Sequence, residues 1–134
     1  MCLGVFLASG LPLALVPWDS QAPAFNVVPL TEHEAPVRQQ FSLAHVVYAG
    51  SHTGCSCGFR SDANDPAAVS RSREALLRYI GQASATGPVE VFVCWEGDYA
   101  AAPRVRGEPT LAAFGCDEAW LEELTFTRLG SSRP

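Results

Sequence analysis

One amphipathic helical pattern, with strand-like runs before and after it, limits the folds open to this chain. The pattern begins at Asp65-Pro66, which has the form of an N-cap residue followed by proline at the first helical position. Apolar residues then recur at helical spacings, and Gly87-Pro88 ends the pattern. These apolar positions are Val69, Leu76, Leu77, Ile80 and Ala83. We expect one helix with a single apolar face that another part of the chain must cover.

Four segments have the composition of β-strands. Residues 2–8 and 89–95 are continuous apolar runs, typical of strands that are covered on both faces. Residues 41–49 alternate between two faces, and this pattern predicts a packed core position for His45. Residues 24–30 contain a proline, which favours an edge strand.

The order of these elements predicts an α+β fold. Because the early strands follow one another without helices, we expect a mixed or antiparallel sheet covered by one or two helices. A ferredoxin-like sandwich is one arrangement of this kind. The length of 134 residues indicates a single domain, residues 1–134. Near the end of the chain, residues 118–124 suit a short helix and residues 124–129 suit a strand.

The charged residues exclude several classes of function. The chain has 9 basic and 14 acidic residues, and every basic residue is arginine. No basic block stands out, so we expect no nucleic-acid groove and no polybasic membrane surface. Without lysine, a P-loop, a Schiff base and a Ser-Lys dyad are also excluded. Any chemistry must then use Cys, His, Ser or carboxylate groups, and the sequence assigns no enzymatic reaction.

The cysteines indicate a reducing, cytoplasmic location. There are 5 of them, and this odd number is not the even framework of a small disulfide-rich secreted domain. Residues 3–17 are apolar enough to suggest an export signal, but no positive charge precedes them. Two prolines interrupt the run, which is also too short to span a membrane.

The densest chemical feature is the stretch GSHTGCSCGF at residues 50–59. In an extended chain Cys55 and Cys57 point to the same side, and His52 reaches the same point if the chain turns at Gly54. Two thiolates and an imidazole suit a transition metal such as zinc or copper. The candidates for a fourth ligand are Cys94, Cys2, His45 and water. The expected metal ligands are therefore Cys55, Cys57 and His52, with Cys94 as the fourth.

Three other interpretations use the same residues. As an exposed dithiol, Cys55 and Cys57 would form a strained, easily reduced disulfide suited to redox chemistry. The glycines near residue 50 also resemble turns that hold phosphate through backbone N–H groups. Alternatively, the cysteines only pack, and the Pro- and Trp-containing segment 11–25 contacts a protein partner or a second copy of the chain in a homo-oligomer.

Overall fold

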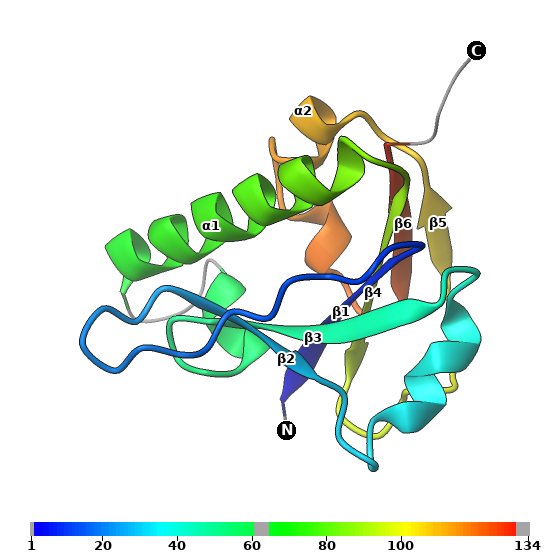
Figure 1. Ribbon diagram of the computed structural model, residues 1–134, viewed down its shortest axis with the longest axis horizontal. Helices are drawn as coiled ribbons and strands as arrows, with labels where there is room; N and C mark the ends of the chain where they lie inside the picture. Colours follow the sequence, from blue (N-terminus) through cyan, green and yellow to red (C-terminus); the bar gives the residue numbers. More distant parts are fainter. Residues whose placement is uncertain (1, 61–64, 131–134) are drawn as a thin grey trace.

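A computed structural model describes residues 2–60 and 65–130, and its strands form one mixed sheet (Figure 1). The spatial order is β2-β3-β1-β4-β6-β5. Neighbouring strands are antiparallel except β5 and β6, which are parallel. The strands are β1 Leu3–Ser9, β2 Phe25–Pro29, β3 His45–Ser51, β4 Val89–Trp95, β5 Val105–Gly107 and β6 Thr125–Leu129. The α+β class predicted from the sequence is confirmed.

The central strand β1 is buried along its whole length, as its unbroken apolar sequence predicts. It pairs with β3 on one side and β4 on the other, so that Val5 lies between Ala49 and Val93. Val5 and Leu7 pack in the core beneath the long helix, whereas Phe6 and Ala8 pack in a second core on the opposite face.

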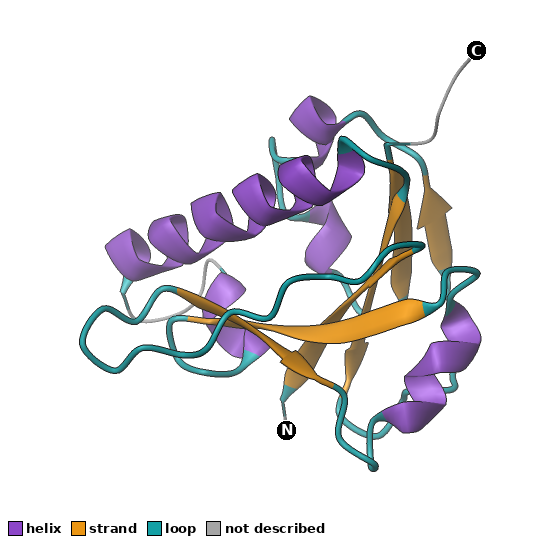
Figure 2. Ribbon diagram, in the orientation of Figure 1, coloured by secondary structure: helices purple, strands orange, loops and turns teal. Residues whose placement is uncertain are grey.

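The long helix α1, Pro66–Ser84, lies along one face of the sheet (Figure 2). The carboxylate of Asp65 accepts a hydrogen bond from the backbone N–H of Ala68 at 3.1 Å, which confirms the predicted N-cap. Leu76 and Ile80 are fully buried against the sheet. The helix is therefore held by its apolar face, as the spacing of these residues predicts.

Short helices complete the two layers. The 3-10 helix η1, Ala35–Gln40, buries Val37 on the face opposite α1. The others are η2 Ser56–Phe59, α2 Leu111–Phe114 and η3 Ala119–Leu121. Where a helix is expected over residues 118–124, only the single turn η3 forms, because the backbone is already extended at Glu122. Neither α2 nor the edge strand β5 is indicated by the sequence pattern, since each is too short to show periodicity.

The third strand begins later than the sequence pattern predicts. Phe41 follows η1 and packs against Phe92 and Phe126, so the chain turns into β3 only at His45. His45 is exposed, which corrects the expectation of a core histidine. His45 is the first residue of β3 and pairs with Ser9, the last residue of β1, so it lies at the end of both strands.

The connectivity separates this fold from a ferredoxin-like sandwich. Three strands precede α1, whereas that sandwich has the order β-α-β-β-α-β. In the described ranges, none of the helices combines the length and apolar character needed to cross a membrane.

The segment before β2 covers the edge of the sheet. Val16 and Val27 exchange backbone hydrogen bonds of 3.0 and 2.8 Å, which occupy part of the edge strand. Leu11, Leu15 and Trp18 remain exposed along this segment. Its role as a contact surface for a partner or a second copy stays a prediction.

Candidate metal centre

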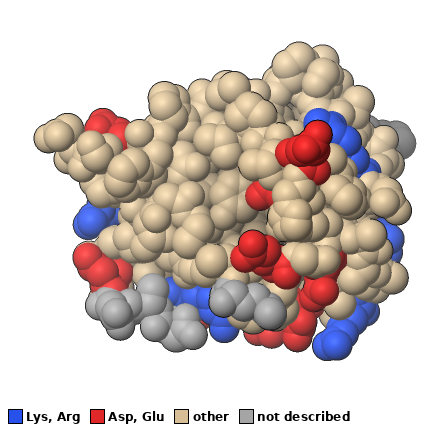
Figure 3. All heavy atoms as spheres, turned by 90° about the horizontal axis from the view of Figure 1, so that it is seen from below, with Lys and Arg blue, Asp and Glu red and all other residues tan. Residues whose placement is uncertain are grey.

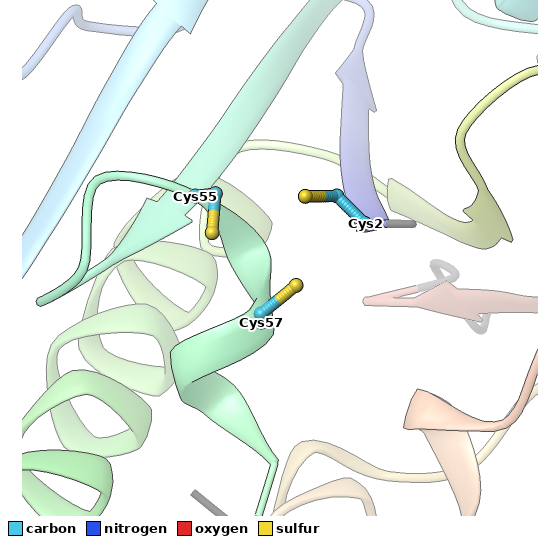
Figure 4. Close-up of side chains that lie close together, drawn as sticks. All are labelled: Cys2, Cys55 and Cys57. Carbon is cyan, nitrogen blue, oxygen red and sulfur yellow. The ribbon is translucent and has the colours of Figure 1, made fainter.

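Three cysteine sulfur atoms lie close together at one end of the sheet. The Sγ atoms of Cys2, Cys55 and Cys57 all lie within 4.8 Å of one another. Figure 4 shows them pointing toward a common space from the start of β1, from the turn after β3 and from η2. A tetrahedral zinc site with Zn–S bonds of about 2.3 Å places its sulfurs roughly 3.8 Å apart. The sulfur separations in the structure therefore exceed those of a zinc site by at most about 1 Å.

The turn after β3 places Cys55. The Ser51 hydroxyl donates to the Cys55 carbonyl at 2.6 Å, and the Ser51 N–H donates to the same oxygen at 2.9 Å. The N–H of Gly54 donates to the Ser51 carbonyl at 3.0 Å. Gly54 has a φ of 89°, a conformation that glycine adopts without strain. This turn directs the chain back toward β1.

Ser56 fastens η2 between β1 and β3. Its hydroxyl accepts from the N–H of Val5 at 2.9 Å and donates to the carbonyl of Ala49 at 2.6 Å. Its own N–H donates to the hydroxyl of Tyr48 at 2.8 Å. Because Val5 and Ala49 are partners across the two strands, the serine hydroxyl bridges the strands directly. Cys57, the next residue, is thereby held beside the start of β1.

A glycine and an arginine fix the other end of η2. A Cβ atom on Gly58 would lie 2.2 Å from the Ser51 hydroxyl, so only glycine allows this close approach. From α1, the Nε of Arg73 donates to the carbonyl of Phe59 at 2.6 Å, and its Nη2 lies 2.8 Å from a carboxylate oxygen of Glu118. Helix α1 therefore anchors the end of η2, which contains Cys57.

The pKa values of the two neighbouring thiols, Cys55 and Cys57, are shifted in opposite directions. Burial raises the pKa of Cys55, but hydrogen bonds from Thr53, from the backbone of Cys57 and from the thiols of Cys57 and Cys2 outweigh it, so the pKa lies below its ordinary value. Burial raises the pKa of Cys57, and the adjacent charge of Cys55 raises it further. Of these two thiols, Cys55 loses its proton more readily.

His52 lies near the cluster but turns toward α1. Its Nδ1 lies 2.9 Å from the Ser72 hydroxyl, and its backbone N–H donates to the same hydroxyl at 2.9 Å. Ser72 is fully buried on α1. Within the described residues, the group of converging ligand atoms does not include His52. The short spacing along the chain keeps His52 near the Cys-x-Cys motif, and the hydroxyl of Ser72 on α1 determines where its imidazole points.

Cys94 lies within β4, opposite Gly4 of β1, and outside the cysteine cluster. It is buried in the core that contains Phe6 and Phe92, and burial raises the pKa of its thiol to about 12. It is not in the converging group. Cys2, which immediately precedes β1, is the cysteine that joins Cys55 and Cys57 in that group. Cys2 is one of the candidates for the fourth ligand, but nothing in the sequence pattern favours it over the others. Only the pairing of β1 with β3 brings residue 2 close to the Cys-x-Cys motif.

The chemistry of this cluster is that of soft sulfur donors. Three thiolates can hold a metal ion, and the thiolate formed first can also act as a nucleophile. No protein-family model, curated protein or solved structure matches the chain. The geometry of the described residues therefore carries the functional argument.

Proposed function

We propose that this protein binds one thiophilic transition-metal ion through the thiolates of Cys2, Cys55 and Cys57. The observation that carries the proposal is the convergence of three sulfur atoms from two distant parts of the chain, the start of β1 and the Cys-x-Cys motif. Hydrogen bonds hold each cysteine in place, so the three sulfurs are already near one another before a metal binds. A reducing compartment such as the cytoplasm would keep the sulfurs available as ligands.

Zinc suits the site better than monovalent copper. Three thiolates carry three negative charges, so the complex has a net charge of −1 with Zn²⁺ and −2 with Cu⁺. Glu34 and Glu96 line the cavity that adjoins Cys2 and Cys55, and they add to the negative potential. The ion of higher positive charge offsets this potential more completely. We therefore propose zinc as the resident metal, with copper as the alternative.

The test is metal stoichiometry in protein purified without chelator. Elemental analysis should find about one zinc per chain, and cobalt added to metal-free protein should give the absorption of thiolate-to-cobalt charge transfer. The His52→Ala variant should keep both properties, because the His52 ring is engaged by Ser72 on α1. Cys116→Ser is the matched control, since Cys116 is exposed and lies outside the cluster. Metal-free protein with no cobalt absorption would overturn the proposal.

A second candidate function is thiol–disulfide exchange at Cys55, favoured by its lowered pKa beside two further thiols. The Cys55 thiolate would attack a disulfide, release one thiolate and form a mixed disulfide. Cys57 or Cys2 would then attack Cys55, lose its proton and release the second thiol. Two electrons thereby pass from the protein thiols to the external disulfide, which is reduced while an internal disulfide forms in the protein.

The opposite pKa shifts predict an order of alkylation in the metal-free protein. Only a thiolate reacts with iodoacetamide, so a thiol of lowered pKa reacts at lower pH. As the pH rises from 6 to 9, Cys55 should be modified before Cys57. Peptide mass spectrometry at each pH measures the two rates. Equal rates of alkylation, or faster alkylation of Cys57, would contradict the opposite pKa shifts of the two thiols.

A further inference from the structure

A cavity of about 310 Å³ adjoins the cysteine cluster on the side of Cys2 and Cys55. This volume is at the lower end of the range for small-molecule sites. Cys57 is not in its lining, so the cavity opens on one side of the cluster only. The other lining residues are Leu3, Gly4, Phe6, Thr31, His33, Glu34, Tyr48, Glu96 and Tyr99. A metal ion bound by Cys2 and Cys55 would lie beside this cavity, because both cysteines are in its lining.

Aromatic rings form one wall of the cavity. The ring of Phe6 makes edge contacts with Tyr48, at 5.5 Å between centroids, and with Tyr99, at 5.9 Å. Gly4 keeps the neighbouring space open, since a Cβ there would lie 2.7 Å from the Phe6 ring. This wall is rigid and apolar, and ring faces attract cations.

Two carboxylates and the imidazole of His33 line the cavity. Glu34 and Glu96 contribute carboxylates, and no arginine is among the lining residues that the structure describes. One oxygen of Glu34 accepts a hydrogen bond from the N–H of Thr31 at 2.9 Å, which holds the carboxylate in place. Figure 3 shows acidic side chains gathered near the middle of the face seen from below, at the end of the molecule where β1 begins. An anionic ligand is disfavoured here, and a cationic group is favoured.

We propose that the cavity binds a small aminothiol, whose sulfur completes the coordination of the metal and whose ammonium group faces Glu34. The inference rests on the proposed metal site. On binding, the thiol releases its proton to solvent as its sulfur bonds to the metal. The resulting ligand carries one negative and one positive charge, so it adds a fourth sulfur without adding net charge to an already negative site.

Three thiols of similar size test the proposal on the cobalt-loaded protein. Cysteamine carries an ammonium group, 2-mercaptoethanol is neutral and mercaptoacetate carries a carboxylate. We expect cysteamine to bind about tenfold more tightly than mercaptoethanol and mercaptoacetate to bind most weakly, as measured by the change in cobalt absorption. Ethanolamine, which has the cation but no thiol, should leave the spectrum unchanged.

Variants show whether the cavity is responsible for this order. Glu34→Gln should reduce the preference for cysteamine by several-fold while cobalt still binds. Glu74→Gln, on α1 and outside the cavity lining, is the matched control. Equal affinities for the three thiols, or removal of cobalt from the protein by cysteamine, would overturn the aminothiol proposal alone. Failure of cobalt to bind at all would instead overturn the metal site on which it rests.

Discussion

Replacing Cys55 by serine is expected to lower the affinity for zinc or cobalt by at least about 100-fold. Loss of a residue that merely supports a ligand costs about 10–100-fold in affinity, and loss of a ligand should exceed this. Of the two proposed ligands in the Cys-x-Cys motif, Cys55 is the better prepared for a metal, because its hydrogen bonds lower the pKa of its thiol. A serine hydroxyl at the same position keeps its proton at neutral pH and offers a poor ligand to a thiophilic ion.

Competition with a chelator of known affinity measures this loss, and thermal unfolding provides a second measurement. A metal that binds only the folded state stabilises it by about 2.7 kcal/mol at a concentration 100 times its Kd. Zinc should therefore raise the Tm of the wild type and of Cys116→Ser, but not that of Cys55→Ser. Without metal, the three proteins should unfold at similar temperatures. Undiminished affinity in Cys55→Ser would contradict the proposed ligand set.

Replacing Arg128 by methionine is expected to lower the free energy of unfolding by about 3 kcal/mol. A guanidinium nitrogen of Arg128 lies 2.5 Å from a carboxylate oxygen of Glu90, whose side chain is only 3% exposed. The Arg128 side chain is 31% exposed, so only the carboxylate is fully buried. Removing one partner of a fully buried pair costs about 3–5 kcal/mol. The lower end applies here because the N–H and hydroxyl of Ser42 still donate to the Glu90 carboxylate at 2.9 and 2.6 Å.

An exposed ion pair in the same protein provides the control. Arg104 and Glu123 lie 4.0 Å apart, and their side chains are 68% and 40% exposed. Arg104→Met makes the same chemical change in water and should alter the free energy of unfolding by less than about 1 kcal/mol. Denaturant unfolding of both variants measures the difference. Equal losses would mean that burial of Glu90 does not strengthen its interaction with Arg128.

Residue patterns within a single segment predicted the secondary structure of that segment well. Asp65-Pro66 begins α1, and the apolar spacing that follows predicts the face by which the helix packs, because both depend on neighbours along the same turns. The apolar sequence of β1 predicts a covered strand for the same reason. His45 shows the limit of such patterns, since Val47 and Ala49 are buried in the core beneath α1 whereas His45, at the start of β3, is exposed.

For the site, spacing alone predicts that Cys55 and Cys57 lie close together, because two residues of chain cannot separate them far. The third member of the cluster depends on pairing between distant strands. Cys2 reaches the motif because β1 lies beside β3 and Ser56 bridges the two. His52 turns away because the hydroxyl of Ser72, twenty residues later, holds its imidazole. The sequence thus determined that two cysteines lie side by side, and the tertiary structure decided which other groups meet them. Such contacts arise from packing between distant segments and leave no periodic signal in the chain.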